Sequence, residues 1–176
     1  DGTTSRGLGD VYKRQYDRFG QSVAISGNYA IVGAHNEDPN NKGAAYIFEK
    51  DTDGSWNQVQ KIVASDRARM DFFGESVAID GNYAIVGAYG KDIDGQSNAG
   101  SAYIFERNTD GTWNQNETQK IVASDRYEND EFGISVAISG NYVIVGAHNG
   151  NSAGSAYIFE RNTNGTWNQT ETQKIV

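Results

Sequence analysis

The chain has 176 residues, enough for a domain with a core of its own, and carries 15 basic against 23 acidic side chains, a formal net charge of −8. This charge opposes binding to nucleic acid, and no apolar run approaches the roughly 18 residues of a membrane-spanning helix, so neither nucleic-acid binding nor membrane insertion is expected. The 21 glycines, the single proline and the many aromatic residues favour short strands and tight turns, and the lack of cysteine excludes disulfides.

Residues 1–15, at the start of the chain, share no pattern with the repetitive sequence that follows. Within them, residues 10–15 (DVYKRQ) resemble the in-frame translation of an adapter used in transposon-based sequencing libraries, and we interpret the head as foreign to the protein. At the other end the chain stops at Val176, where earlier copies of the same motif continue into Ala-Ser-Asp-Arg. We therefore expect both ends to be cut and the parent chain to be longer.

The rest of the chain consists of three copies of one unit, placed at residues 16–65, 66–124 and 125–176, the third truncated. A Phe-Gly pair opens each copy, at Phe19, Phe73 and Phe132, and a tryptophan recurs in step. The segments that follow read SVAISGNYAIVGA, SVAIDGNYAIVGA and SVAISGNYVIVGA. Self-similarity at such a period indicates a repeat architecture.

Each copy contains four predicted strands, at residues 22–26, 29–34, 43–49 and 56–64 in the first copy. The first two strands flank Gly27-Asn28, a pair typical of a tight β-hairpin, and the last two flank the Asp-Gly step of DTDG. The second strand has apolar residues at both odd and even positions, which point to opposite faces, so both faces of the sheet are expected to be buried. Repeated four-stranded antiparallel sheets with two buried faces are the blades of a β-propeller, and we predict an all-β fold of three such blades.

The order of Phe-Gly, SVAISG, Val32-Gly33-Ala34 and an aromatic third strand resembles the FG-GAP repeat, the integrin-α-like β-propeller family, in its bacterial form. The resemblance implies a closed ring, usually of seven blades, in secreted or surface proteins used for adhesion. It also implies that the remaining blades of the parent chain are partners of these three. Three blades alone would expose two apolar faces, and we expect such a piece to be poorly soluble or unfolded.

Integrin-type repeats often hold calcium in a long Asp-rich loop between the first two strands, but here that connection is only Gly-Asn. Two residues cannot supply the six to eight oxygens that calcium takes, so no metal or other cofactor is expected. Asp51-Thr52-Asp53-Gly54 is interpreted as an ordinary hairpin turn, and Asp92 and Asp94 as either a solvated loop or a weak calcium site. The aspartates two residues before each Phe-Gly pair are expected to stabilise turns, at Asp17, Asp71 and Asp130.

No Ser-His-Asp trio, glycine-rich phosphate loop or metal-binding histidine spacing occurs in the sequence, so catalytic residues are not expected and the chain is not expected to be an enzyme. The two histidines, His35 and His148, stand at equivalent positions after Gly-Ala, with Tyr89 in the middle copy. These side chains are either ligand contacts or simply polar and aromatic groups at strand exits.

The connection between the second and third strands differs in every copy, whereas the first hairpin is always Gly-Asn. Variable loops on a constant scaffold usually carry recognition, although neutral drift is the alternative explanation. We predict an extracellular or cell-surface module that binds a protein or glycan through these loops; a structural spacer, or the propeller of a larger secreted enzyme, are the alternative functions. The candidate ligand-binding residues are His35, Asn36, Glu37, Asp38, Tyr89, Lys91, Asp92, Asp94, His148 and Asn149.

Overall fold

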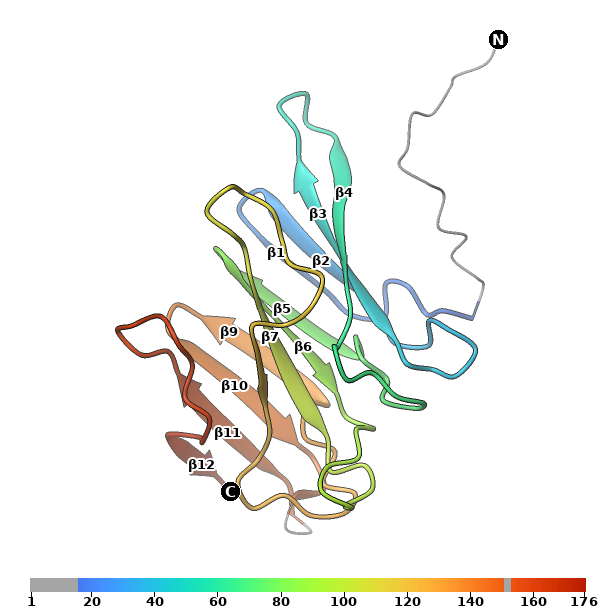
Figure 1. Ribbon diagram of the computed structural model, residues 1–176, viewed down its shortest axis with the longest axis vertical. Helices are drawn as coiled ribbons and strands as arrows, with labels where there is room; N and C mark the ends of the chain where they lie inside the picture. The colour runs from blue at the N-terminus through green and yellow to red at the C-terminus, as the bar shows by residue number, and fades with distance from the viewer. Residues whose placement is uncertain (1–15, 151–152) are drawn as a thin grey trace.

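A computed structural model describes residues 16–150 and 153–176, so the interpretation of residues 1–15 falls outside the described residues. Strands in the described part form three four-stranded antiparallel sheets, each following the chain order (Figure 1). No helix in this part is long and apolar enough to cross a membrane. The predicted all-β architecture of three propeller blades is confirmed.

Each blade is one sheet, and its strands run from the inner to the outer edge in sequence order. The first blade contains β1 (Val23–Ser26), β2 (Tyr29–Ala34), β3 (Ala44–Lys50) and β4 (Trp56–Ile62). The second contains β5 (Ser76–Asp80), β6 (Tyr83–Ala88), β7 (Ser101–Glu106) and β8 (Gln119–Ile121). The third contains β9 (Ser135–Ser139), β10 (Tyr142–Ala147), β11 (Ser155–Glu160) and β12 (Gln173–Ile175).

The two hairpins of each blade form where the sequence predicts them. Ser26 pairs with Tyr29 across the first turn, and Gly27 has a φ of 56°, which glycine adopts without strain. In the second turn the Oδ1 of Asp53 accepts a hydrogen bond from the Ser55 amide at 2.8 Å. The DTDG segment is therefore a hairpin turn stabilised by its own aspartate, as expected.

The fourth strand departs from the prediction in two blades. In the first blade β4 covers most of the predicted residues 56–64, but β8 and β12 have only three residues each. The cause is two extra residues, because Asn116-Glu117-Thr118 replaces Val59 of the first copy. The longer segment forms a loop in which the Glu117 carboxylate accepts hydrogen bonds from the amide and hydroxyl of Ser65, at 2.9 and 2.6 Å. The insertion thus ties the second blade to the end of the first.

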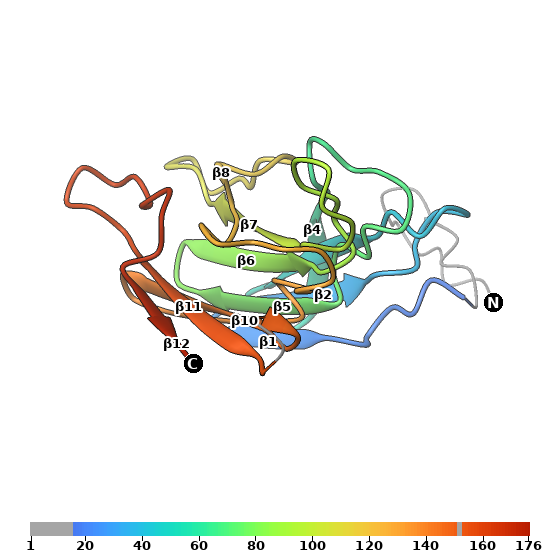
Figure 2. The same ribbon diagram turned by 90° about the horizontal axis from the view of Figure 1, so that it is seen from below.

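The blades pack face to face in a row, with the first and third blades at opposite ends and the second between them (Figures 1 and 2). The first strands are neighbours, with β1 beside β5 and β5 beside β9. One apolar cluster fills the space between the first two blades and a second cluster the space between the last two. Both faces of the middle sheet are therefore buried, as the continuous apolar pattern of its second strand predicts.

The Phe-Gly and Gly-Ala pairs meet where two blades touch. The Phe73 ring is fully buried against Tyr103 of its own blade, with ring centroids 5.5 Å apart. The next residue, Gly74, brings its carbonyl oxygen so close to Gly33 of the preceding blade that a Cβ on Gly33 would lie 2.0 Å from it. The Ser22 hydroxyl donates a 2.7 Å hydrogen bond to the same carbonyl. The motif is thus an interblade contact that requires glycine.

A second repeated contact joins the outer parts of neighbouring blades. Trp113 of the second blade packs edge-on against Tyr29 of the first, with centroids 5.9 Å apart. The Arg107 guanidinium lies 4.9 Å from the Tyr29 ring centroid and donates a 3.0 Å hydrogen bond to its hydroxyl. The third blade repeats the arrangement on the second with Trp167, Arg161 and Tyr83.

Candidate functional site

The loops between second and third strands share one end of the blades with the linkers that enter the next blade. Backbone hydrogen bonds join the loops to the linkers. The Met70 amide donates to the Asn40 carbonyl at 2.8 Å, and the Asn129 amide donates to the Ser97 carbonyl at 2.8 Å. The hairpin turns lie at the opposite end of the strands (Figure 1). We call the end formed by residues 16–21, 35–43, 63–75, 89–100 and 122–134, together with His148 to Gly150, the loop face.

A row of variable side chains runs across all three blades on the loop face. The His35 and Phe72 rings have centroids 6.1 Å apart, and Phe72 stacks on Tyr89 with centroids 5.1 Å apart and planes 6° from parallel. In the third blade, the His148 Nδ1 lies 3.1 Å from the Glu131 Oε2. We call this row the strip, and its members are Arg18, His35, Phe72, Tyr89, Glu131 and His148.

Burial and nearby charges set the ionisation of the strip. The His35 side chain is 10% exposed, and its Nδ1 lies 3.1 Å from the Glu75 Oε2. Burial lowers the pKa of His35 below its usual value; the Glu75 carboxylate acts in the opposite direction, and Arg18 adds to the lowering. Burial also raises the pKa of the Tyr89 phenol, with further contributions from Glu75 and Glu131. His35 is therefore neutral at neutral pH, and Tyr89 keeps its proton.

The lowered pKa of His35 predicts a pH-dependent stability. The unfolded chain takes up a proton at this imidazole near pH 6.5, whereas the folded chain resists it, so the free energy of unfolding falls as the pH drops through and below about 6.5. We expect His35→Gln to lose this component, while His148→Gln, at a side chain 54% exposed, keeps it. Thermal unfolding between about pH 5 and 8 measures the effect, and equal pH profiles for wild type and His35→Gln would contradict it.

Three of the strip residues adopt a backbone conformation that L-residues avoid. Arg18, Phe72 and Glu131, each directly before a Phe-Gly pair, have φ angles of 56°, 53° and 58°. Such a left-handed conformation costs roughly 1–2 kcal/mol for a residue other than glycine. The Phe72 amide is held by the Asn41 carbonyl of the preceding blade, and the Glu131 amide by that of Asn98. The same conformation in all three copies belongs to the repeated turn that precedes each Phe-Gly pair.

One predicted site residue, Glu37, belongs to the scaffold. The equivalent contacts in the second blade explain its role. There Tyr103 donates a 2.8 Å hydrogen bond to the Asp66 carboxylate, and Lys120 donates a 2.7 Å hydrogen bond to the same carboxylate. Although burial alone would raise it, these two hydrogen bonds hold the pKa of Asp66 below its usual value. The third blade repeats the contacts with Tyr157, Lys174 and Asp125.

In the first blade Glu37 replaces this aspartate. Tyr46 and Lys61, the equivalents of Tyr103 and Lys120, both donate to its carboxylate. The position that corresponds to Asp66 in sequence is residue 12, a tyrosine outside the described residues. Glu37 therefore accepts hydrogen bonds from two side chains of its own blade.

Lys91, at the position equivalent to Glu37, is also part of the scaffold. Its ammonium group lies 3.0 Å from the Asp71 Oδ2 and donates a 2.5 Å hydrogen bond to the Asp66 carbonyl. The two side chains of the Lys91–Asp71 pair are only 8% and 4% exposed. Asp71 also accepts the Ala68 amide at 2.6 Å, so the expected turn-stabilising role of the aspartate before Phe-Gly is confirmed.

The remaining predicted site residues lie on the loop face outside the strip. Asn36 is half-buried, and its backbone amide donates a hydrogen bond to the Asp17 carbonyl. Asn149 is exposed. Asp38 caps the Asn40 amide at 2.8 Å and lies 3.6 Å from Arg67.

Neither aspartate of the middle loop is arranged as a metal ligand. Asp92 accepts the Asn98 amide at 2.9 Å, and Asp94 forms an ion pair with Arg126. Within residues 16–150 and 153–176, no three His, Asp or Glu side chains gather in a way that could hold a metal ion.

Comparison with known proteins identifies the repeat. The FG-GAP repeat family matches residues 13–48, 56–105 and 115–159, more than half of the chain. The chain belongs to the FG-GAP repeat family. The second and third FG-GAP matches run from the fourth-strand region of one blade through the third strand of the next, so the sequence repeat is offset from the structural blade and spans the interblade contact.

No curated protein matches the FG-GAP chain by sequence. Among solved structures, the periplasmic gluconolactonase PpgL of Pseudomonas aeruginosa is similar, with a TM-score of 0.50 and 15% identity over 80% of this chain. The FG-GAP chain spans only 39% of the length of that protein. At this identity the likeness concerns the propeller fold alone.

Four residues of the site escaped the sequence-based prediction. Arg18, Phe72, Glu75 and Glu131 lie in or beside the Phe-Gly motif, which the sequence presents as scaffold. The available signal is that the residue before Phe-Gly is Arg, Phe and Glu in the three copies, a change of charge and size within an otherwise constant motif. Such a position is free to vary because its side chain is not part of the repeated core.

Proposed function

We propose that this FG-GAP chain is a recognition module that binds an extracellular protein or glycan through the strip on its loop face. The observation that carries the proposal is that strip residues differ in charge and size between copies, whereas the strands that support them are nearly identical. A rigid sheet scaffold with variable residues at one end is a common arrangement for binding. The turn before each Phe-Gly pair has the same backbone conformation in all three copies, so it holds the three different side chains in equivalent places.

The chemistry of the strip suits a ligand with both apolar and polar faces. The Phe72–Tyr89 stack offers a half-buried aromatic surface, and the carboxylates of Glu75 and Glu131 offer hydrogen-bond acceptors at its sides. A sugar ring or a basic side chain could lie against the rings and bond to the carboxylates. Because the strip supplies stacking and hydrogen bonds rather than a nucleophile beside a base, we propose binding rather than catalysis.

We also propose an extracellular or cell-surface location. Membership of the FG-GAP family supports this location, and the similar propeller protein PpgL is described as periplasmic. A secreted-protein fraction probed with an antibody against the chain, in cells that express the parent gene, would test the location directly.

The binding proposal is tested on an array of immobilised glycans and of extracellular matrix proteins, with the chain purified as part of its longer parent protein, because the three blades alone are expected to be poorly soluble. Substitutions at single strip residues are preferable to loop replacement, because whole-loop replacement would remove the scaffold residues Glu37 and Lys91. We expect Tyr89→Ala and Glu131→Gln each to weaken binding at least about tenfold, whereas Asn28→Ala and Thr163→Ala on the hairpin face leave it unchanged. Binding that survives both strip variants, or that disappears in the hairpin variants, would place the site elsewhere.

A further inference from the structure

The second blade carries its own cation at the loop face. The Lys91 ammonium lies 3.0 Å from the Asp71 carboxylate and 3.7 Å from the Asp66 carboxylate, and it donates a 2.5 Å hydrogen bond to the Asp66 carbonyl. Lys120 also binds the Asp66 carboxylate, at 2.7 Å. Two lysines therefore balance two aspartates at this place, which matters because a buried charge is costly unless it is paired.

The third blade repeats both aspartates with the same contacts. Asp130 is 5% exposed and accepts the Tyr127 amide at 2.6 Å, the distance that the equivalent aspartate of the second blade has from its own amide partner. Asp125 accepts hydrogen bonds from Tyr157 at 2.9 Å and from Lys174 at 2.5 Å. The anionic half of the arrangement is therefore the same in both blades.

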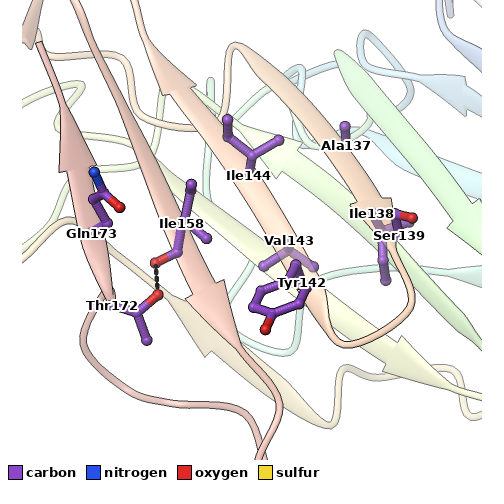
Figure 3. Close-up of a pocket in the computed structure, with 9 residues that line it drawn as sticks. All are labelled: Ala137, Ile138, Ser139, Tyr142, Val143, Ile144, Ile158, Thr172 and Gln173. Atoms are coloured by element: carbon purple, nitrogen blue, oxygen red, sulfur yellow. Dashed lines mark hydrogen bonds between the residues drawn. The ribbon is translucent and has the colours of Figure 1, made fainter.

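The strands that carry the tyrosine and the lysine are aligned alike in the two blades. Lys174 lies opposite Tyr157, and the second blade has the same register. The Thr172 hydroxyl donates to the Ile158 carbonyl at 3.0 Å (Figure 3), and the equivalent hydrogen bond of the second blade measures 3.2 Å. Tyr157 belongs to the apolar cluster between the second and third blades, so the arrangement lies on the side of the third blade that the second blade covers.

One member of the arrangement differs, because Gly150 stands where the second blade has Lys91. A Cβ on Gly150 would lie 3.3 Å from the Ser155 Oγ, so this hydroxyl borders the space into which a longer side chain at that position would extend. The Ser155 Oγ is buried and has no hydrogen-bond partner within residues 16–150 and 153–176. A buried, unpaired oxygen therefore borders the space that the lysine takes in the second blade.

The change from lysine to glycine also alters the balance of charge. Asp125 and Asp130 share a single lysine, Lys174, and no lysine or arginine nitrogen of the described residues lies within 4.0 Å of the Asp130 carboxylate. Arg126, which follows Asp125, forms its ion pair with Asp94 of the second blade instead. One further positive charge is therefore needed to match the balance of the second blade.

We propose that the third blade binds a monovalent cation of about the size of ammonium, such as potassium, at the place that the Lys91 ammonium has in the second blade. Its ligands are the Asp125 and Asp130 carboxylates, the Asp125 carbonyl and the Ser155 hydroxyl, all of them oxygens, which hard cations prefer. A single positive charge completes the balance, whereas a divalent ion would exceed it. The site is distinct from the calcium loops considered from the sequence, and it lies outside the strip.

The cation is detected by thermal unfolding of the chain within its longer parent protein. Measurements in about 0.15 M potassium chloride are compared with N-methylglucamine chloride at the same ionic strength, because that organic cation is too large for the site. A ligand that binds only the folded state raises the unfolding temperature. We expect potassium or ammonium to raise it by about 3 °C, and magnesium at equal ionic strength to have little effect.

Variants at Gly150 assign the effect to this site. Gly150→Lys supplies the ammonium from the chain, so the unfolding temperature in N-methylglucamine chloride should rise by about 3 °C and the response to potassium should disappear. Gly150 is not among the glycines with positive φ, so its backbone accepts a side chain. Gly150→Met is the matched control, since it fills the same space without a charge, and it should lose the potassium response without the gain in stability. Asp130→Asn should lose the response as well.

The position of the ion is tested with rubidium, which has the charge of potassium and is located in crystals by its anomalous scattering. We expect a rubidium peak between Asp130 and Ser155 in the wild type and none there in Gly150→Lys. Equal unfolding temperatures of the wild type in potassium chloride and N-methylglucamine chloride would exclude the site. A potassium response that both Gly150→Lys and Asp130→Asn retain would overturn the proposal by placing the ion elsewhere on the parent protein.

Discussion

Gly87→Ala is expected to lower the free energy of unfolding by about 3 kcal/mol, at the upper end of the usual effect of overpacking. A Cβ at this position would lie 1.9 Å from the Gly133 carbonyl oxygen of the third blade. That carbonyl cannot simply move away, because the Ser76 hydroxyl donates to it at 2.7 Å and the Gly133 amide is bound to the Gly146 carbonyl. The second and third blades must therefore separate locally to admit one methyl group.

Gly146→Ala provides a control within the same Val-Gly-Ala sequence. There the nearest atom to an added Cβ is the Ser135 hydroxyl oxygen at 2.3 Å, and that hydroxyl can rotate, whereas a backbone carbonyl cannot. We expect a loss below about 1 kcal/mol. Urea unfolding followed by tryptophan fluorescence measures both variants. Equal losses would show that close approach of the blades is not what requires glycine.

The repeated parts of the fold are predictable because their signals are local. Gly27-Asn28 and the Asp-Gly steps specify hairpins within a few residues, and apolar residues on both parities indicate burial on both faces. The fourth strand was overestimated in the later blades because Glu117 binds Ser65 of the preceding blade. A hydrogen bond between residues far apart in the sequence competes with strand pairing, and no local sequence pattern predicts it.

The candidate site was predictable only in part, for a related reason. The sequence correctly predicted that the variable loops and the interblade linkers lie at one end of the blades, since an antiparallel order fixes which connections share an end. It did not indicate that Phe72 of a linker stacks on Tyr89 of a loop, because these residues meet only after the chain has passed through β5 and β6. Equivalent positions also have different roles: Glu37 accepts from a tyrosine and a lysine, whereas Lys91 pairs with an aspartate.

The second large effect is expected at Lys91. Lys91→Met should lower the free energy of unfolding by about 3–5 kcal/mol, because it leaves the Asp71 carboxylate buried without its cation. The matched control is Lys120→Met, which removes a lysine 29% exposed from the 41% exposed Asp66, and it should cost less than about 1 kcal/mol. Chemical denaturation of both variants gives the comparison, and a loss no larger at Lys91 than at Lys120 would contradict the prediction.

The charge on Asp71, rather than lost packing, should account for most of the Lys91→Met effect. Burial raises the pKa of Asp71 above its usual value, while the Ala68 amide and Lys91 act against this shift. Because the folded chain binds this proton more readily than the unfolded chain, the contribution of Asp71 to stability decreases as the pH rises through its folded pKa. Without Lys91 that pKa rises further, so the loss caused by Lys91→Met should be smaller at about pH 5 than at about pH 7.

Adding Asp71→Asn to Lys91→Met removes the charge but keeps an oxygen that can accept the Ala68 amide hydrogen bond. The double variant should restore more than half of the stability lost at neutral pH. If the double variant is no more stable than Lys91→Met alone, packing of the lysine stem is the cause, and the buried pair contributes little.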